Sequence, residues 1–176
     1  MSLESKLSAA IRDVPDFPKE GIVFKDITPI MMDAKLSVEV VDHLYNIYKD
    51  LDLDAVAGIE SRGFLFGYPL AMKLGVPFIL IRKKGKLPHN VLSVNYDLEY
   101  GSATIEMHID AVSAGQKILL HDDLLATGGS AEAAGRLVQK AGGEVAGFNF
   151  LVSLDFLNGV EKLKGFSNNI TNLVAY

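Results

Sequence analysis

Apolar side chains near the start of the chain recur at helical spacing. Residues 3–13 and 35–50 carry them every three or four positions, which is the pattern of an amphipathic helix. Between these segments, residues 13–21 hold two prolines that break the pattern, and residues 22–24 are short and extended. The N-terminal part therefore predicts two helices joined by an extended segment.

From residue 54 onward, short apolar runs alternate with helical segments. The runs rich in branched residues predict strands at 54–59, 76–82, 117–121 and 145–154. Helical spacing predicts helices at 64–74, ending at Gly75, and at 129–140, ending at Gly142 and Gly143. Strands separated by helices predict an α/β fold with a parallel sheet and helices on both faces.

Residues 84–110 interrupt this alternation, because they hold no strong helical pattern. Alternating segments at 92–94 and 103–105 give the region the character of a hairpin. Long excursions of this kind are often lids over binding sites, and we expect a mobile lid here. Ligands of parallel sheets bind at the carboxyl ends of the strands, so the residues that follow the strands are the candidates for a binding site.

Length and composition narrow the function classes. A chain of 176 residues without a linker or repeat suits a single domain. The chain has no cysteine, which excludes disulfides, thiolate zinc sites and a cysteine nucleophile. Its apolar runs are too short to span a bilayer, and its acidic N-terminus is unlike a secretory signal. We expect a cytoplasmic protein with no membrane partner.

The formal net charge of −5 argues against nucleic acid as the main partner. One basic segment departs from the acidic average, because Arg82, Lys83, Lys84 and Lys86 put four cations into five positions. Such a run is usually a solvated face. Binding of an anionic ligand is the alternative interpretation.

The clearest chemical signal is the thirteen-residue string at 118–130. An apolar strand leads into Asp122 and Asp123, and a Thr-Gly-Gly-Ser turn then opens a helix. A helix N-terminus offers unpaired N–H groups and the positive end of the helix dipole, and glycines let an anion approach the backbone closely. The turn therefore predicts a cradle for a monophosphate, made of Ala126, Thr127, Gly128, Gly129 and Ser130.

The two carboxylates indicate which phosphate compound would bind. Asp122 and Asp123 can accept hydrogen bonds from the 2′ and 3′ hydroxyls of a ribose whose 5′-phosphate lies in the turn. They would also stabilise positive charge on the sugar ring. The alternative is that both are turn residues and Ser130 a helix cap. No GxxxxGK[ST] and no GxGxxG pattern occurs, so a P-loop kinase or Rossmann dehydrogenase is not supported.

This string resembles the motif by which type I phosphoribosyltransferases bind 5-phospho-α-D-ribose 1-diphosphate (PRPP). Further segments resemble signatures of the adenine phosphoribosyltransferases, at residues 15–29, 60–67, 81–88 and 98–101. The resemblance covers residues 15 to about 145 in order. It implies the type I phosphoribosyltransferase fold over residues 1–176, with a hood from about 1–30 and 150–176 and a flexible catalytic loop.

The resemblance also implies an activity, namely transfer of the phosphoribosyl group of PRPP to adenine, giving AMP and diphosphate in purine salvage. It implies Mg²⁺ bound through PRPP rather than held by the protein, and a homodimer. Two alternatives remain open. One is the same transfer to a 6-oxopurine, and the other is a non-catalytic regulator that binds PRPP.

Roles for the base and the diphosphate follow from the same resemblance. Backbone groups of Val23 and Lys25 would bind the edge of adenine, with Phe24 stacking on one face and Leu157 covering the other. The peptide bond between Glu60 and Ser61 is typically cis in such proteins. The residues expected to bind the diphosphate are Ser61, Arg62, Arg82, Lys83 and Lys86.

Glu99 lies in the excursion and matches a glutamate that faces N7 of adenine in this family. As an acid it would donate a proton to N7 while N9 attacks the sugar. Together with Asp122 and Asp123, it is the expected catalytic set. Glu106 is a nearby competitor for the same role, and Tyr100 would help to close the lid.

Three positions depart from the family pattern. Ser153 and Val160 stand where relatives commonly carry Glu and Arg, which leaves the second wall of the base pocket less defined. His121 occupies a strand position that is usually aliphatic, and we expect a buried histidine satisfied by a neighbour. The other histidines show no ligand spacing, so no metal site built from protein side chains is expected.

Overall fold

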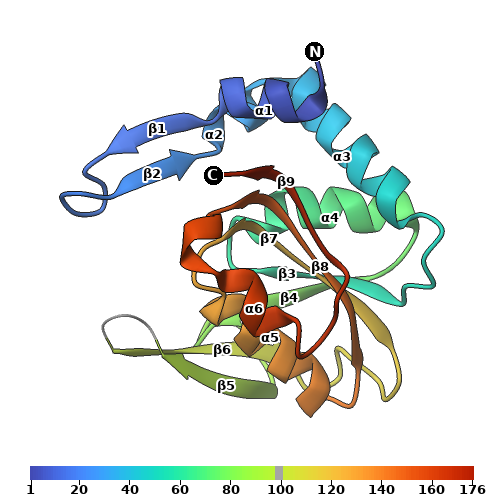
Figure 1. Cartoon of the computed structure of the whole chain (residues 1–176). Helices are drawn as coiled ribbons and strands as arrows, with labels where there is room; N and C mark the ends of the chain where they lie inside the picture. The colour runs from blue at the N-terminus through green and yellow to red at the C-terminus, as the bar shows by residue number, and fades with distance from the viewer. Residues whose placement is uncertain (98–100) are drawn as a thin grey trace.

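Helices cover both faces of a central sheet in the computed structural model, which describes residues 1–97 and 101–176 (Figure 1). One helical layer lies on the side of the N-terminus, and it consists of α1 (Leu3–Ala10), α2 (Thr28–Met32), α3 (Ala34–Tyr48) and α4 (Gly63–Leu74). The opposite layer consists of α5 (Gly129–Lys140) and α6 (Gly159–Leu163). The prediction of helices on both faces is confirmed.

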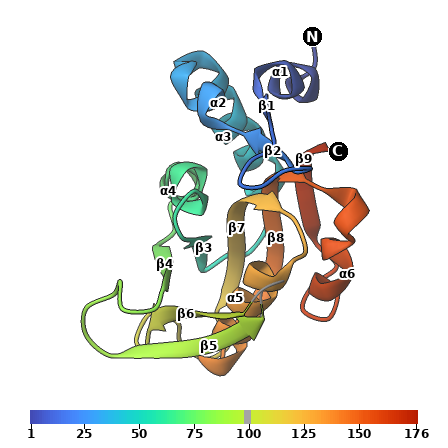
Figure 2. The ribbon, with the colours of Figure 1, turned by 90° about the vertical axis from the view of Figure 1, so that its left-hand side faces the viewer.

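The central sheet has seven strands in the order β5-β6-β4-β3-β7-β8-β9. Their bounds are β3 (Ala55–Ile59), β4 (Phe78–Lys83), β5 (Val91–Asp97), β6 (Ser102–His108), β7 (Lys117–Leu125), β8 (Glu144–Ser153) and β9 (Ile170–Ala175). Neighbours from β4 to β9 are parallel, which confirms the predicted parallel sheet. The predicted hairpin is also present, because β5 pairs with β6 in antiparallel fashion at one edge of the sheet (Figure 2).

Successive residues of a strand face opposite sides of a sheet, so β3 contributes to two apolar cores. Val56 packs into the core below α3 and α4, whereas Ala55 and Ala57 pack into the core on the side of α5. All five residues of β3 are buried, as is typical of a parallel strand covered on both faces. This rigid centre ends at the edge of the sheet where the polar residues gather.

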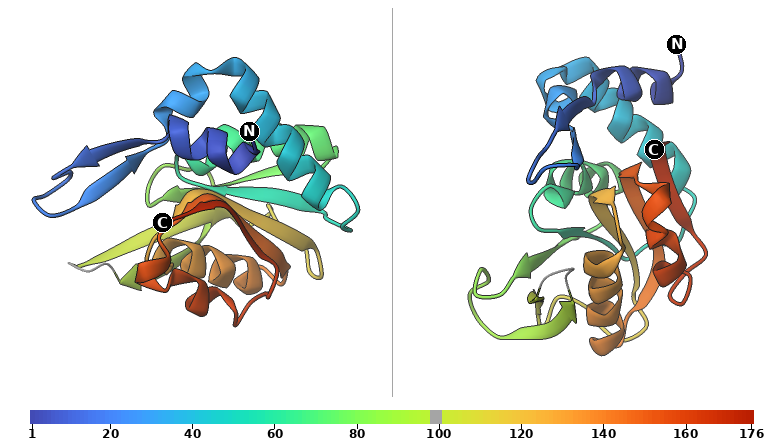
Figure 3. Two further views of the ribbon diagram at one scale, coloured as in Figure 1. Left: turned by 45° about the horizontal axis from the view of Figure 1, so that its top comes forward. Right: turned by 60° about the vertical axis from the view of Figure 1, so that its left-hand side comes forward.

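Two strands were absent from the sequence prediction. Residues 13–21 were expected only to break the helical pattern, yet β1 (Arg12–Pro15) pairs with β2 (Val23–Asp26), with Val14 opposite Phe24. This hairpin projects from the body of the molecule (Figure 3). β9 was also unexpected, and it adds to the sheet beside β8. Both rely on pairing with a partner strand, which a local sequence pattern does not record.

β7 is longer than the predicted strand at 117–121. It continues to Leu125 because Asp122 pairs with Phe150 of β8, and Leu124 pairs with Val152. The two acids therefore belong to the strand and not to the turn after it. The assignment of residues 1–30 and 150–176 to a hood stays a prediction, as does the mobility of the excursion at 84–110. Within the part of the chain that the structure describes, no helix has the length and apolar character to cross a membrane.

His121 lies in β7 with its side chain fully buried. Its Nδ1 is 2.5 Å from Oδ1 of Asn149 on β8, so one ring nitrogen has the expected neighbour, whereas Nε2 has no hydrogen-bond partner among the described residues. Burial lowers the pKa of His121 to about 4, although the bond to Asn149 pushes the pKa upward. The ring is therefore neutral at physiological pH and donates its Nδ1 proton to the amide oxygen.

We expect replacement of both partners, His121→Leu with Asn149→Leu, to flatten the pH dependence of stability below pH 6.5. In the wild type, the unfolded chain binds a proton near pH 6.5 that the folded ring does not take up until about pH 4. The free energy of unfolding therefore falls as the pH falls through this window, by about 3 kcal/mol at its lower end.

Urea unfolding of both proteins at a series of pH values measures this difference. The raised pKa of Asp122 acts in the opposite direction, but it is present in both proteins and cancels in the comparison. The single variant His121→Leu is a control, because Asn149 then loses its partner at every pH. Equal slopes in the wild type and the double variant would contradict the assignment.

Candidate active site

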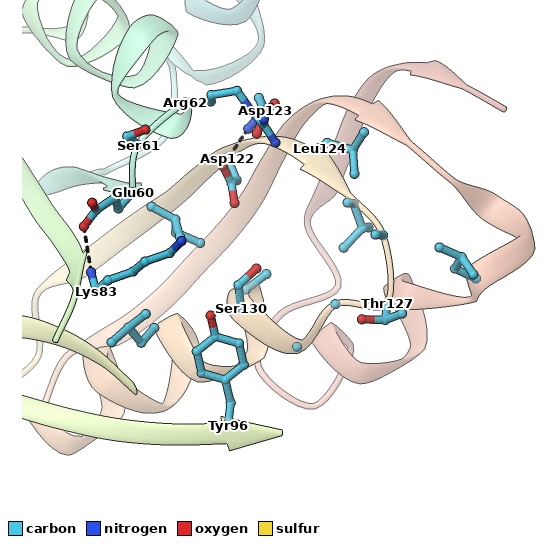
Figure 4. A pocket seen from close by; sticks show the side chains of 18 of the residues that line it. Glu60, Ser61, Arg62, Lys83, Tyr96, Asp122, Asp123, Leu124, Thr127 and Ser130 are labelled. Atoms are coloured by element: carbon cyan, nitrogen blue, oxygen red, sulfur yellow. Dashed lines mark hydrogen bonds and ion pairs between the residues drawn. The ribbon is translucent and has the colours of Figure 1, made fainter. Parts of the chain in front are cut away.

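A cavity of about 520 Å³ opens at the carboxyl ends of β3 and β7, where parallel sheets bind their ligands (Figure 4). Its wall combines segments that lie far apart in the sequence. They are residues 59–62 after β3, residues 122–131 from β7 into α5, Lys83 of β4, Tyr96, Asp97 and Ile105 of the hairpin, and Leu157. The sheet thus brings together residues from both motifs that were predicted to bind PRPP.

The glycine turn forms the floor of the cavity at the start of α5. Gly128 has a left-handed φ of +80°, and a Cβ atom there would lie 2.7 Å from the carbonyl oxygen of Gly159. A glycine is therefore required at this position by both conformation and space. α5 begins at Gly129, so the unpaired N–H groups of its first turn and the hydroxyl of Ser130 lie at the cavity wall.

The two acids have different environments, because successive strand residues point to opposite sides. Asp122 points into the cavity toward Ser130, whereas Asp123 points toward Arg62 (Figure 4). Nε of Arg62 donates to Oδ2 of Asp123 at 2.5 Å. Burial, together with the charge of Asp123, raises the pKa of Asp122 well above its usual range.

Close packing between α4 and β7 sets the distance between the two motifs. A Cβ atom at Gly63 would lie 2.6 Å from the carbonyl oxygen of His121 and 3.2 Å from the Cα of Asp122. The absence of a side chain at Gly63 lets Ser61 and Arg62 approach the acids of β7. The peptide bond between Glu60 and Ser61 is cis, as the resemblance implied.

The basic run divides into cations inside and outside the cavity. Among the described residues, Lys83 is its one member that lines the cavity. Arg82 turns instead to Glu60, with Nε 3.2 Å from Oε2, and to the carbonyl oxygen of Lys86 at 3.2 Å. Arg82 and Lys86 therefore lie outside the cavity. The other residues predicted to bind diphosphate line it, namely Ser61, Arg62 and Lys83.

Glu60 was given no role by the sequence, yet it organises this corner of the site. Its Oε2 also accepts the backbone N–H of Lys83 at 2.7 Å. Burial pushes the pKa of Glu60 upward, but the bonds from Lys83 and Arg82 outweigh burial and bring that pKa below its ordinary value. The ionised carboxylate holds the end of β4 so that the side chain of Lys83 extends into the cavity (Figure 4).

The residues predicted to bind the base lie on two separate elements. Leu157 ends the short helix η1 (Asp155–Leu157) and lines the cavity. Phe24 lies on β2, where its ring packs against Phe17 with centroids 5.2 Å apart. The guanidinium of Arg62 lies 5.5 Å from the centre of the Phe24 ring, so Arg62 links β2 to the cavity.

Two residues that the sequence did not single out line the cavity at the end of β5. Tyr96 points toward Ser130 (Figure 4), and burial, followed by the charge of Asp122, raises its pKa. Asp97 is its neighbour. The predicted hairpin was the signal that could have found them, because it brings the end of β5 back over the glycine turn.

The predicted acid Glu99 and the lid residue Tyr100 lie outside the described residues. Glu106, the competitor of Glu99, is buried on β6. Its carboxylate accepts the backbone N–H of Gly85 at 2.9 Å and the hydroxyl of Ser93 at 3.2 Å. These contacts join β6 to the start of the excursion and to β5, and they give Glu106 a structural role.

The structure also bears on metal binding. Among residues 1–97 and 101–176, no group of three His, Asp or Glu side chains could hold a metal ion. Asp122 and Asp123 offer carboxylate oxygens, but Asp123 is already paired with Arg62. This donor set fits Mg²⁺ that takes most of its ligands from a bound substrate and water, as Mg²⁺ commonly does.

Comparisons with known proteins agree with this geometry. The chain matches the family model of the phosphoribosyl transferase domain over residues 33–162. It is 49% identical to the adenine phosphoribosyltransferase of Cytophaga hutchinsonii, across 99% of this chain and 96% of that protein. The crystal structure of adenine phosphoribosyltransferase from Thermoanaerobacter pseudethanolicus superposes with a TM-score of 0.94, at 46% identity, and covers 99% of this chain and 100% of that one.

A second solved structure, from Saccharomyces cerevisiae, is a complex of adenine phosphoribosyltransferase with an imino-altritol bisphosphate and adenine. It superposes with a TM-score of 0.90 at 40% identity, over 97% of this chain and 98% of that one. Similarity of sequence and structure over nearly the whole chain thus agrees with the glycine turn, the paired acids and the cavity between them: this chain belongs to the adenine phosphoribosyltransferase family.

Proposed function

We propose that this chain transfers the phosphoribosyl group of PRPP to adenine, giving AMP and diphosphate. The observation that carries the proposal is the cavity in which Asp122 and Asp123 meet the glycine turn of α5. A phosphate cradle beside two hydroxyl acceptors is complementary to a ribose 5-phosphate. The yeast relative binds adenine together with a bisphosphate, which supports the same pair of substrates.

Each part of PRPP has a complementary group in this cavity. The N–H groups of the turn and the hydroxyls of Thr127 and Ser130 bind the 5′-phosphate. Asp122 and Asp123 accept hydrogen bonds from the ribose hydroxyls. Ser61, Arg62 and Lys83 lie on the side where the diphosphate leaves, and Arg82 and Lys86 assist from outside the cavity.

Asp123 would exchange its bond to Arg62 for a ribose hydroxyl, since Nε of Arg62 donates to its Oδ2. That exchange frees the guanidinium for the diphosphate. Mg²⁺ bound through PRPP would neutralise the charge of the diphosphate, and Asp122 and Asp123 would hold the ribose hydroxyls of the same complex.

Adenine binds between β2 and η1, where the two walls carry aromatic and aliphatic side chains. The backbone of Val23 and Lys25 reads the edge of the base, while Phe24 stacks on one face and Leu157 covers the other. Stacking on an aromatic side chain contributes about 1–3 kcal/mol per base. Arg62 lies 5.5 Å from the Phe24 ring and so borders both substrates.

The reaction breaks the bond from the anomeric carbon to diphosphate and forms a bond from that carbon to N9 of adenine. As the sugar gains positive charge, the carboxylates of Asp122 and Asp123 stabilise it at close range. AMP carries no proton on N7 or N9, so proton balance reverses the direction expected from the sequence: N9 attacks while the ring proton is on N7, and the carboxylate of Glu99 accepts that proton as the new bond forms. Tyr100 closes the lid with Glu99. A closed lid excludes water, which would otherwise compete as the nucleophile.

We also propose that the chain forms a homodimer. α4 supports this, because Leu65, Tyr68 and Met72 follow one another at helical spacing and are 43%, 54% and 65% exposed. Exposed apolar stripes of this kind mark protein interfaces. Sedimentation equilibrium should give twice the mass of one chain, and a single-chain mass at micromolar concentration would contradict the dimer.

The function is tested by incubating the protein with PRPP, Mg²⁺ and each base in turn. We expect AMP and diphosphate with adenine, and far slower turnover with hypoxanthine, guanine or xanthine. A site that hydrogen-bonds a substrate group discriminates strongly against analogues that lack the group. Faster turnover with a 6-oxopurine would show that the substrate is that base and not adenine. Binding of PRPP without turnover of any base would indicate a non-catalytic regulator.

The double replacement Asp122→Asn with Asp123→Asn should preserve the fold and reduce kcat by roughly 10²-fold or more. Amides keep the size of the side chains but remove the charge that stabilises the sugar in the transition state. Asp50→Asn with Asp52→Asn is a matched control, since both of those acids are exposed. Turnover near the wild-type value in the Asp122 and Asp123 variant would contradict the role of these two acids in binding the ribose.

Glu99→Ala should lower kcat by roughly 10²- to 10⁴-fold, because general acid–base help at N7 is lost, while KM for PRPP changes little. Glu106→Gln is the comparison, since the amide oxygen can still accept the bond from Gly85 while the amide NH2 donates to the hydroxyl of Ser93. An unchanged kcat in Glu99→Ala together with a loss in Glu106→Gln would move the acid–base role to Glu106.

A further inference from the structure

The two walls of the proposed base site come from distant parts of the sequence. Phe24 and the backbone of Lys25 lie on β2, whereas Leu157 lies on η1, which follows β8. A base stacked between such walls loses part of its dispersion energy if their separation grows by a fraction of an ångström, because dispersion weakens steeply with distance. Tyr176, which follows β9, contacts both elements.

The backbone of Tyr176 is bonded to the segment that carries Leu157. Its carbonyl oxygen accepts the N–H of Asp155, the first residue of η1, at 2.9 Å. Its own N–H donates to the carbonyl oxygen of Ser153, the last residue of β8, at 3.0 Å. The position of Tyr176 is therefore fixed relative to the start of η1.

Side-chain bonds reinforce this junction. The hydroxyl of Ser153 donates to Oδ1 of Asp155 at 2.5 Å and accepts from Nδ2 of Asn172 on β9 at 3.0 Å. Ser153 is buried, so these bonds are shielded from water. The end of β8, the start of η1 and the end of β9 thus form one bonded unit.

The ring of Tyr176 contacts the other wall. The ammonium of Lys25 lies 3.7 Å from the centre of the ring, within the range of a cation–π interaction. The same ammonium is 2.7 Å from Oδ1 of Asp13, which is paired with Lys25 across the β1–β2 hairpin. The Lys25 side chain is only 13% exposed, and partial desolvation strengthens both contacts.

We propose that Tyr176 is a positioning residue that sets the spacing between the two walls of the adenine site. The inference rests on the proposed function, because it assumes that adenine binds between β2 and η1. The β1–β2 hairpin projects from the body (Figures 1 and 3), and the end of β9 lies beside it. The Lys25–Tyr176 contact ties this hairpin to the unit that holds Leu157.

Steady-state kinetics of three replacements test the inference. Tyr176→Ala removes the ring, Tyr176→Leu keeps apolar bulk without a π face, and Tyr176→Phe keeps the face. We expect KM for adenine to rise roughly 3- to 30-fold in the Ala and Leu variants, the range that loss of a cation–π contact gives. KM for PRPP should stay near the wild-type value in all three, and Tyr176→Phe should bind adenine like the wild type.

Lys25→Met tests the contact from the other side, because it removes the ammonium and leaves the backbone that reads the base. It should raise KM for adenine by a similar factor, and adding Tyr176→Ala should raise it little further, since both changes remove one interaction. Multiplicative effects of the two changes would overturn the proposal.

The other outcomes separate this inference from the proposed function. An active wild type, with KM for adenine unchanged in Tyr176→Ala, overturns the inference alone. A parallel rise in both KM values, with Tyr176→Phe as impaired as Tyr176→Ala, indicates a general structural role and also overturns it. A wild type that turns over no base overturns the proposed function and this inference with it.

Discussion

The ion pair between Arg62 and Asp123 connects the main parts of the candidate site. Asp123 belongs to a buried strand at the centre of the sheet, while Arg62 follows the neighbouring strand and also lies over the ring of Phe24. One guanidinium therefore connects Asp123, the cavity and the ring of Phe24, to which the proposed function assigns the sugar, the diphosphate and the base. Because Asp123 is buried, this pair is poorly screened, and a ligand must supply an equivalent partner before it can be exchanged.

The geometry also gives the two adjacent acids different tasks. Since both remain within β7, one faces the cavity and the other faces Arg62. Burial and the neighbouring charge of Asp123 raise the pKa of Asp122. A cation or a ribose hydroxyl beside Asp122 would stabilise its ionised form, in keeping with the proposed binding of PRPP together with Mg²⁺.

Several features were accessible from the sequence because they depend on local patterns. Spacing of apolar residues predicted α3, α4 and α5, short apolar runs predicted β3, β4, β7 and β8, and the glycine turn predicted the start of α5. The basic run was less informative, because sequence proximity suggested a common role for Arg82, Lys83 and Lys86. Only packing shows that Glu60 turns Arg82 away and directs Lys83 inward. Likewise, Tyr96 lines the cavity because the hairpin returns over the glycine turn, whereas the sequence pattern predicted a lid in this segment without singling out Tyr96.

By itself, the sequence determined the α/β class, the glycine turn and the presence of two acids beside it, because each depends on residues within a few positions of one another. Tertiary structure decided which side each acid faces, which cation enters the cavity and how β1, β2 and β9 pair. Those outcomes depend on contacts between residues tens of positions apart, such as Gly63 with His121 and Lys25 with Tyr176. Local spacing carries no record of such contacts, since they arise only when separate elements pack into one core.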